Sequence, residues 1–294
     1  MEVKPINKHR FSLAGVVPVD GQPLDFDFPW HDCLMPIGQN FLAVERAIYD
    51  CALAGCNTIW VVCSKDIQPL IRYRLGDYIL DPHYFFKEAR FGKYPKEKQI
   101  PIYYVPVHPK DEGRRNSLSW SIITGAHNSW VVSRKISRWT TPDKYFVSFP
   151  YSAFHSPFLA SSRTKIRSEQ PFCVSFENKT FKDGLYLPFT FSCEDYLITR
   201  RKFRAEEKRI RDKDFNIIPA EERFSGRFFT HDQVFSEIDQ ENLDILEVSW
   251  YYDISSWQGL KTWLSSDKKL DKPKDFILSY SELNPLGKDF DEEE

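Results

Sequence analysis

The sequence predicts a three-layer α/β domain in which helices cover both faces of a doubly wound, mostly parallel sheet. Short, almost entirely apolar runs alternate with stretches of helical periodicity over roughly the first 165 residues. An apolar run without polar alternation is typical of a strand that is covered on both faces. At the start of the chain a strand, a loop, a helix, a glycine and a second strand follow one another, which is the order of a βαβ unit.

The first half of the chain gives the strongest signals. Apolar residues recur at helical spacing over 40–54, and Gly55 follows where such a helix would end. The run 58–63 is short and almost entirely apolar, which fits a strand that is covered on both faces. The expected elements are strands at 11–17, 58–63, 100–107 and 144–149, a long loop at 18–36, and helices at 40–54, 66–75 and 117–127.

After about residue 165 the pattern changes to shorter β-like pieces. We expect residues 1–286 to form a single domain with two halves, 11–165 and 166–286, followed by a flexible acidic tail at 287–294. The elements expected in the second half are β-like segments at 172–177 and 180–187, a charged helix at 194–213, a strand at 243–251 and a helix at 256–264.

Composition and charge argue against several classes of function. The 40 basic and 42 acidic residues give a net charge of -2, which supplies no global field to hold nucleic acid. No apolar run is long enough to span a membrane, and residues 1–11 lack the apolar core of a secretory signal, so we expect no membrane partner and a cytoplasmic location. The six cysteines form no C-x-x-C pair, which predicts reduced, structural thiols and no metal cluster.

A series of short motifs runs through residues 13–64. They are Ala14-Gly15, Pro23-Leu24, Pro29, Leu34-Met35-Pro36-Ile37, Val44-Glu45-Arg46-Ala47 within the expected helix, Ala54-Gly55, and Ile59-Trp60-Val61-Val62. Their order and spacing resemble the opening of the sugar nucleotidyltransferases, which join a nucleoside triphosphate to a sugar phosphate and release pyrophosphate. In that family a strand and a Gly-rich loop precede a Pro-Lys pair, a Leu-x-Pro-Val-like turn, a helix, an Ala-Gly and an apolar strand.

Two later motifs support the same resemblance. Gly113-Arg114-Arg115-Asn116-Ser117-Leu118 lies where the family has a Gly-Thr-Ala-like turn before a helix. Tyr252-Asp253-Ile254-Ser255-Ser256-Trp257 is similar to the family's Trp-x-Asp-Ile-Gly-Thr. The resemblance covers roughly residues 11–265. It implies a Rossmann-like fold of the nucleotide-diphospho-sugar transferase type, with a nucleotide-binding first half and a second half that supplies the substrate site and a flap.

The resemblance also implies a site at the carboxyl edge of the sheet, where open α/β sheets bind ligands. It implies a nucleoside triphosphate or a nucleotide-sugar as partner, with a sugar phosphate as a second substrate, and Mg²⁺ as cofactor with Asp253 as its ligand. No residue is assigned a catalytic role. The residues expected to bind the nucleotide are Ala14, Gly15, Asp20, Gly21, Gln22, Gly113, Arg114 and Arg115.

Two departures from the family pattern bear on catalysis. The family has an Arg and a Lys in its first loop, whereas residues 16–23 contain no basic residue and Trp30 stands where the Lys would be. The first of two acidic metal ligands would follow the strand at 144–149, where this chain has Pro150-Tyr151-Ser152. A tyrosine hydroxyl is a poor replacement for a carboxylate as a Mg²⁺ ligand.

Other residues offer substitutes, and each has a plain structural alternative. Asp20 or Asp32 would bind the ion from the first loop, or else form a turn or a cap. His31 would act as an acid or base, or lie on the surface. Asp253 would cap the helix that follows it. The basic run at 200–213 is interrupted by acidic residues, which favours a solvated helix face over a nucleic-acid contact and leaves open an anionic substrate.

Two functions follow from these features. The first is a nucleotidyltransferase-like enzyme, in which a phosphate or hydroxyl attacks the α-phosphate of a nucleotide in line. The second is a catalytically inactive protein that keeps the scaffold and acts as a binding or interaction module, since a fold does not fix a chemistry. Release of pyrophosphate from nucleoside triphosphate, sugar phosphate and Mg²⁺ separates the two.

Overall fold

A computed structural model describes residues 11–21, 28–83, 98–136, 141–207, 211–219, 226, 229–238 and 242–279. Within these residues a central sheet has the strand order β11-β9-β10-β7-β1-β4-β6-β5. Its strands are β1 (Leu13–Pro18), β4 (Thr58–Val62), β5 (Tyr78–Leu80), β6 (Gln99–Val105), β7 (Lys144–Val147), β9 (Phe172–Ser175), β10 (Phe189–Ser192) and β11 (Asp244–Glu247).

The pairing of these strands confirms the predicted sheet. β1 lies in the middle and is parallel to β4 and β7, while β4 is parallel to β6. The carboxyl ends of these four strands therefore meet at one edge. β10 runs antiparallel to both of its neighbours, β5 runs antiparallel to β6, and β11 is parallel to β9. The doubly wound, mostly parallel sheet predicted from the sequence is present.

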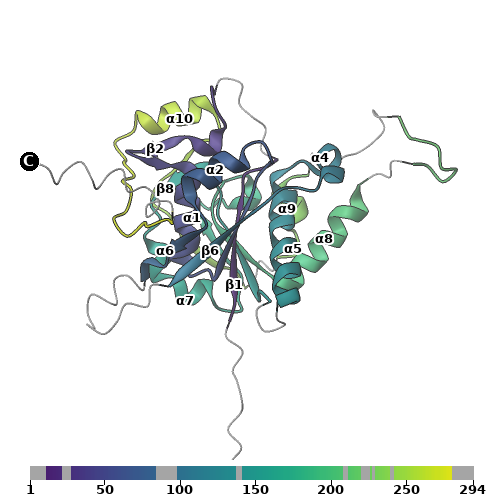
Figure 1. The fold of residues 1–294 in the computed structure, drawn as a ribbon, viewed down its shortest axis with the longest axis horizontal. Helices are drawn as coiled ribbons and strands as arrows, with labels where there is room; N and C mark the ends of the chain where they lie inside the picture. The colour runs from purple at the N-terminus through teal and green to yellow at the C-terminus, as the bar shows by residue number, and fades with distance from the viewer. Residues whose placement is uncertain are drawn as a thin grey trace, which may run out of the picture.

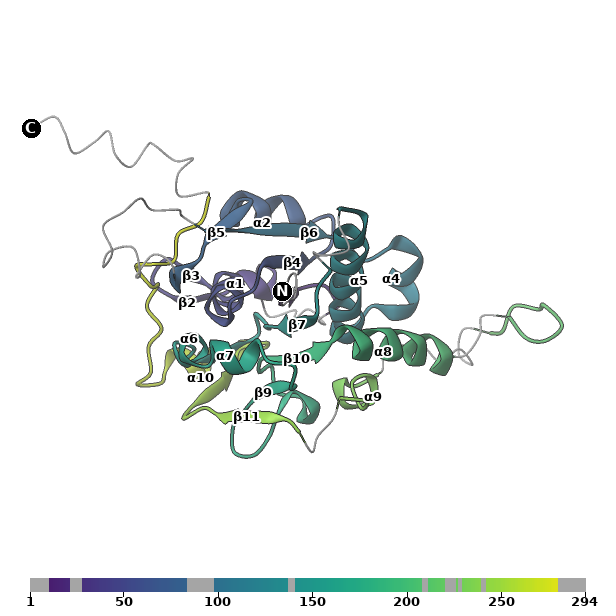
Figure 2. The ribbon, with the colours of Figure 1, turned by 90° about the horizontal axis from the view of Figure 1, so that it is seen from below.

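Helices cover both faces of the sheet, which gives three layers (Figures 1 and 2). One face carries α1, α6 and α7, and the other carries α5, α8 and α9. α2 follows β4, and α4 joins β6 to α5. These helices are α1 (Ala43–Ala54), α2 (Gln68–Leu75), α4 (Pro109–Arg115), α5 (Leu118–Ile136), α6 (Phe158–Ser161), α7 (Arg163–Ile166), α8 (Cys193–Glu206) and α9 (His231–Val234).

The first helix, α1, is buried on every side, although its sequence predicts one buried face. A side-chain oxygen of Glu45 accepts from the Leu42 amide at its start, and Gly55 ends it at a φ of 86°. Every residue of α1 is buried, because α6 and α7 pack on the side that the sheet leaves open. Its polar residues Arg46 and Asp50 are paired with each other inside the protein.

A second, smaller core lies beside the carboxyl edge. It is formed by β2 (Pro36–Gly38), β3 (Phe41–Leu42), β8 (Ser152–Phe154), β12 (Tyr251–Asp253) and α10 (Trp257–Leu264). The 3-10 helix η1 (Asp32–Leu34) precedes β2, and its Cys33 belongs to the main core. Buried Met35, Ile37 and Trp263 pack together there, and the Trp263 indole donates to the Ile37 carbonyl at 3.2 Å. Figure 1 shows α10 and β2 above the end of α1 at which the carboxyl edge lies.

Residues 275–279 cover the edge strand β5. The Leu80 amide donates to the Ile277 carbonyl at 3.0 Å. The Ser279 hydroxyl accepts from the Asp77 amide at 2.6 Å. A segment close to the end of the described chain thus continues the hydrogen bonding of the sheet beyond its last strand.

Three elements of the second half differ from the prediction. The β-like segment at 180–187 is instead a 3-10 helix, η3 (Phe181–Asp183), because Thr180 caps its start and Gly184 ends it at a φ of 90°. The charged helix ends at Glu206, and Arg211 forms an isolated bridge. The strand expected at 243–251 is split into β11 and β12.

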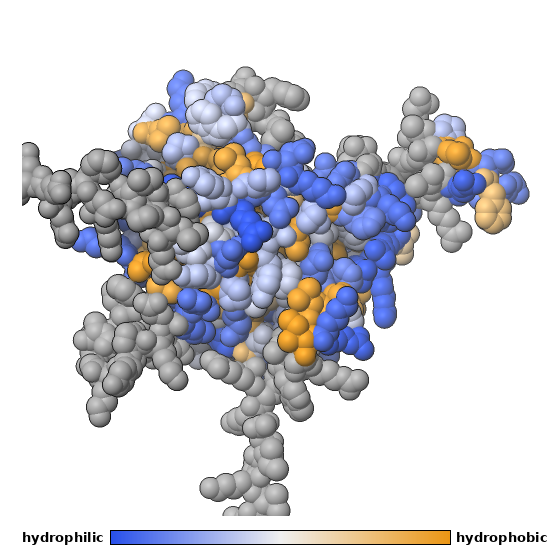
Figure 3. All heavy atoms as spheres, viewed as in Figure 1, coloured by the Kyte–Doolittle hydropathy of each residue, from blue (hydrophilic) through white to orange (hydrophobic). Residues whose placement is uncertain are grey.

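Other expectations concern the loop, the tail and the thiols. The loop at 18–36 contains η1, and the tail at 287–294 lies outside the described residues. All six cysteines are free thiols, with Cys193 half-buried and the others buried, as predicted. On the face shown in Figure 3, hydrophilic residues gather over the side where α4 and α8 lie.

Among the described residues, no helix combines the length and the apolarity that crossing a bilayer would need.

Candidate functional site

Tyr151 joins the two segments that the sequence predicts to form a site. Its hydroxyl donates to the carbonyl of Val19, just after β1, at 2.6 Å. Its own carbonyl accepts from the amide of Ile254, next to Asp253, at 2.9 Å. Tyr151 is fully buried. The loop after β1 and the turn at Asp253 therefore lie at the same carboxyl edge, as the resemblance requires.

The loop after β1 is a tight turn that packs on the start of α5. The amides of Asp20 and of the residue before it both donate to the Val62 carbonyl, at 2.9 and 2.8 Å. The Ser121 hydroxyl donates to the Asp20 carbonyl at 2.5 Å. Gly21 has a φ of 90°, and a Cβ placed on it would lie 2.4 Å from the carbonyl carbon of Ser117. A glycine is required there by both conformation and space.

Three ionisable side chains lie on or beside this loop. Burial raises the pKa of Asp20, a hydrogen bond from the Gly21 amide opposes the shift, and the Glu112 carboxylate adds to it. Asp32 is 1% exposed, and in the described structure no hydrogen bond reaches either of its carboxylate oxygens. His31 Nδ1 lies 3.0 Å from Asp32 Oδ1 and 3.3 Å from the amide of the next residue. A protonated Nδ1 pairs with the carboxylate, whereas an unprotonated one accepts from the amide.

The register of β8 and β12 places Asp253 directly across from Ser152. Ser152 belongs to the segment 150–152 in which the resemblance implies the first metal ligand, so this segment and Asp253 are neighbours. Ser152 is buried, and its hydroxyl donates to the Tyr186 carbonyl at 2.6 Å. Asp253 is exposed, and its Oδ1 accepts from the Ser255 amide at 2.8 Å, which closes a turn ahead of α10; the cap of α10 is Ser256 rather than Asp253. Ser152 and Asp253 supply one carboxylate between them, so they do not fit a two-carboxylate Mg²⁺ site. Among the described residues, no group of three His, Cys, Asp or Glu side chains could hold a metal ion.

The arginines expected at the nucleotide already have carboxylate partners. Gly113 lies within α4 rather than in a turn, and the turn before α5 comes after Arg115. Arg115 lies 2.5 Å from Glu207 and also pairs with Asp111. Arg114 lies 3.3 Å from the same Glu207 carboxylate. The positive charge of this segment is thus largely matched within the protein.

The remaining predicted binding residues lie in two places. Ala14 and Gly15 are buried inside β1 rather than in the loop that follows it. A Cβ on Gly15 would lie 2.9 Å from the sulfur of Cys51, so Gly15 allows α1 to approach the strand. Gln22 lies outside the described residues. Of the expected set, Asp20 and Gly21 lie on the turn at the edge, and Arg114 and Arg115 come just before Ser117, which that turn contacts.

The buried Arg46–Asp50 pair of α1 was not identified from the sequence, and it binds the segment that leads into β8. Arg46 Nη1 lies 2.5 Å from Asp50 Oδ2, and Nη2 donates to the Phe149 carbonyl at 2.5 Å and to the Ser152 hydroxyl at 3.4 Å. Burial lowers the pKa of Arg46 and raises the pKa of Asp50, and their mutual attraction opposes both shifts. An Arg and an Asp four residues apart, in a helix that is mostly apolar after Glu45, are the signal that would have revealed the pair.

A doubly wound sheet with a glycine turn and the Asp253 turn at one carboxyl edge is the fold of the sugar nucleotidyltransferases. The structure is similar to that of a putative glucose-1-phosphate thymidylyltransferase from Bacillus anthracis, with a TM-score of 0.53, 10% identity, and coverage of 89% of this chain and 98% of that one. It is also similar to an apo UDP-glucose pyrophosphorylase, with a TM-score of 0.50, 11% identity, and coverage of 86% and 97%. At such identities the likeness shows the fold. No protein-family model matches the sequence, and no curated protein matches it.

Proposed function

We propose that this protein binds a nucleotide or a nucleotide-sugar at the carboxyl edge of β1, β4 and β7. The contact of Tyr151 with both Val19 and Ile254 carries the proposal, because it brings the β1 loop and the Asp253 turn to one place. Open α/β sheets bind their ligands beyond the carboxyl ends of the strands. A thymidylyltransferase and a UDP-glucose pyrophosphorylase share the fold, which favours this class of ligand.

In this proposal the ligand rests on the glycine turn. Asp20 and Gly21 face the nucleotide from the β1 loop, and the start of α5 supports the turn through Ser121. Gln22, which lies outside the described residues, stays a sequence-based prediction. Arg114, whose side chain is 36% exposed, exchanges Glu207 for a phosphate when the ligand is bound. Mg²⁺, where it takes part, is held by Asp253 together with phosphate oxygens and water, which is a common arrangement for this ion.

Transfer of a nucleotidyl group to a sugar phosphate is the enzymatic form of this proposal, and binding without transfer is the second candidate. One observation favours the second candidate. The hydroxyls of Tyr151 and Ser152, at the position of the family's first acidic ligand, both donate to backbone carbonyls inside the protein. Asp253 then stands without the second carboxylate that the family pattern would place beside it.

Nucleotide binding is tested by thermal denaturation with a panel of nucleoside triphosphates and nucleotide-sugars, with and without Mg²⁺. A ligand present at about 100 times its Kd stabilises the folded state by about 2.7 kcal/mol, so the melting temperature rises in a saturable way. Absence of such a rise for every nucleotide and nucleotide-sugar contradicts the proposal.

Pyrophosphate release, measured with the nucleotide that binds and a panel of sugar phosphates, decides between the two candidates. If transfer occurs, Asp253→Asn abolishes it, whereas Asp267→Asn, which changes an exposed aspartate just beyond α10, leaves it unchanged. Binding without pyrophosphate release in the unmodified protein identifies a binding module.

A further inference from the structure

A cavity of about 630 Å³ lies on the outer side of α5, between α4, α8 and the loop that follows β6. Trp120, Thr124 and His127 line it, and their spacing places them on one face of α5. Gly125 lies on the opposite face, where a Cβ would meet the side chain of Val16 in β1 at 2.7 Å. The helix therefore separates this cavity from the central strands.

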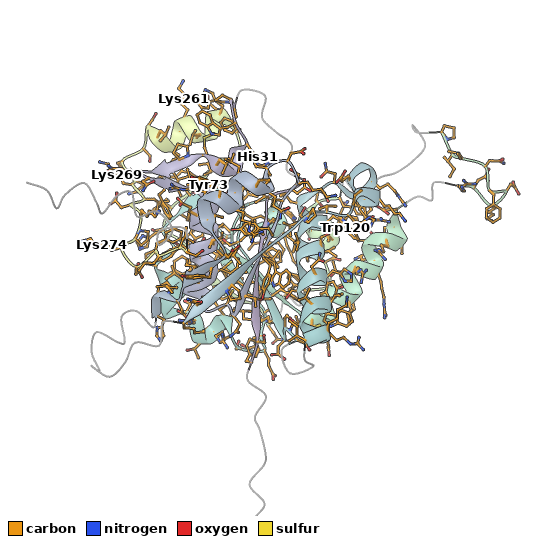
Figure 4. The ribbon with its side chains drawn as sticks, viewed as in Figure 1. His31, Tyr73, Trp120, Lys261, Lys269 and Lys274 are labelled. Atoms are coloured by element: carbon orange, nitrogen blue, oxygen red, sulfur yellow. The ribbon has the colours of Figure 1, made fainter. Side chains whose placement is uncertain are left out.

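The cavity adjoins the edge proposed to bind a nucleotide, because Lys65 follows β4 and Val105 ends β6, but it does not include the glycine turn. The glycine turn after β1 contacts α5 at its first turn, through Ser117 and Ser121. Neither residue lines the cavity. Figure 4 shows Trp120 among α4, α5 and α8, and His31 apart from it at the carboxyl edge. A ligand in the cavity thus occupies a second place on the protein.

The lining of the cavity is strongly basic. Lys65, Lys110, Arg200 and Arg204 border it, and Asp111 is its single carboxylate. Asp111 already pairs with an arginine of α4. Within the described part of the chain, no ion pair joins a carboxylate to Arg200 or Arg204, which are one helical turn apart on α8. Burial and the neighbouring Arg200 lower the pKa of Arg204, which reflects charges of one sign held close together.

A chain of hydrogen bonds joins three side chains at the wall of this cavity. Arg200 Nη1 donates to the Tyr196 hydroxyl at 3.1 Å, and that hydroxyl lies 2.7 Å from His127 Nδ1. Burial and the two arginines lower the pKa of His127 to about 4, so the ring is neutral at pH 7. Arg200 Nη2 lies 3.5 Å from His127 Nε2, which accepts from it when the ring proton is on Nδ1. Tyr196 and His127 therefore hold the Arg200 guanidinium at the cavity wall.

Trp120 supplies an independent observation. It is 3% exposed, and among the described atoms its indole N–H has no hydrogen-bond acceptor. A buried N–H without an acceptor is destabilising unless a ligand or a water molecule accepts from it. The guanidinium of Arg204 lies over the ring at 5.6 Å. The unpartnered N–H thus belongs to the same wall as the unpaired arginine.

We propose that this cavity is a second ligand site, which binds the phosphate group of a small phosphorylated molecule. Phosphate oxygens accept from Arg200, from Arg204 and from the indole N–H of Trp120, and a bound anion neutralises the excess of positive charge. The volume lies in the range of small-molecule sites and exceeds what a phosphate fills. Val107 and Ile123, which also line the cavity, contact the less polar part of the ligand.

The experiment is a titration of the full chain with inorganic phosphate at constant ionic strength. Binding is monitored by NMR through the ring resonances of His127. The expected result is a saturable shift. Arg204→Gln raises the Kd for phosphate about tenfold or more, which is the loss of one charge-assisted hydrogen bond. Arg204→Lys keeps the charge and loses the planar guanidinium with its paired N–H donors. Its Kd for phosphate therefore lies between that of Arg204→Gln and that of the unmodified protein. A chemical denaturation curve confirms that each variant is folded.

Arg201→Gln is the matched control, because Arg201 lies on the same helix, is exposed and does not line the cavity. It removes the same charge and leaves the Kd within about twofold, as expected for loss of a distant, screened charge. Equal weakening by Arg201→Gln and Arg204→Gln, or no saturable shift of His127, overturns the proposal. Asp20→Ala leaves the His127 shift unchanged, so a failure of the nucleotide site is distinguishable from a failure of this one.

Organic ligands complete the test. A sugar phosphate and a nucleoside monophosphate are titrated in the same way, and the proposal requires at least one of them to bind more tightly than inorganic phosphate. A single-stranded oligonucleotide is the third probe. If it binds more tightly than all of these and loses affinity equally in Arg201→Gln and Arg204→Gln, the surface is a nucleic-acid contact and the small-molecule proposal is wrong.

Discussion

Replacing Arg46 by methionine tests the physical account of the carboxyl edge most directly. Arg46 is 1% exposed and joins Asp50 in α1 to the Phe149 carbonyl and the Ser152 hydroxyl. Arg46→Met keeps most of the side-chain volume and removes the guanidinium. It leaves the Asp50 carboxylate buried without its cation, which destabilises a protein by about 3–5 kcal/mol.

The pH dependence of this variant has a definite sign. In the unmodified protein, burial raises the pKa of Asp50 and the attraction of Arg46 opposes the shift. Without Arg46 the folded-state pKa of Asp50 rises further above that of the unfolded chain. The folded state then binds a proton more readily than the unfolded state, so the stability deficit of Arg46→Met shrinks as pH falls through the raised pKa.

Urea denaturation at several pH values measures both effects, and Arg46→Met with Asp50→Leu is the informative double variant. Removing both charges together leaves no unpaired ion, so the double variant recovers most of the lost stability. A loss below about 1 kcal/mol for Arg46→Met contradicts the assignment of Arg46 as the anchor of this edge. A double variant no more stable than Arg46→Met contradicts it as well.

Three further predictions concern other parts of the chain. Burial lowers the pKa of His231 to about 4. The unfolding free energy therefore falls by up to about 3 kcal/mol as pH drops from about 6.5 to 4, and in His231→Gln it depends less on pH over this range. Gly21→Ala, which meets the Ser117 backbone, lowers the melting temperature more than Gly184→Ala, which has the same φ of 90° and open space around it. A thiol reagent modifies Cys193 first in the native protein and all six cysteines after denaturation, because the other five are buried.

Apolar runs, helical periodicity and glycines correctly predicted the strands and helices of the first half of the chain. The run that forms β4 is almost wholly apolar because it lies inside the sheet with α5 packed on it, and every residue after its first is buried. The periodicity of α1 and the glycine that ends it gave the first crossover correctly. Once these elements are placed, the right-handed crossover rule leaves few sheets to consider. The doubly wound fold follows from them without any tertiary information.

The parts of the site that the sequence did not predict depend on contacts between segments far apart in the chain. β8 and β12 are far apart in the chain, and their pairing is what sets Ser152 against Asp253. Nothing local indicates that the Tyr151 hydroxyl is used by the carbonyl of Val19. The full burial of α1 depends on α6 and α7, which are four residues each and too short to show a period.

The sequence left open an anionic substrate at the basic run 200–213, but it did not reveal the cavity, for a related reason. Arg200 and Arg204 lie in a run with many acidic neighbours, which reads as a solvated helix face. Their spacing of one turn places both on one side of α8, but the sequence does not say that α4 and α5 meet them there. A site built from three elements becomes visible when the elements are packed together.

The covered strand β5 has a consequence for how the protein behaves in concentrated solution. A free strand at the margin of a sheet is a template on which other molecules assemble. Here residues 275–279 already take the hydrogen bonds that β5 would offer. Shortening the chain before residue 275 would expose that template, so a truncated version would aggregate through a strand that the full chain keeps closed.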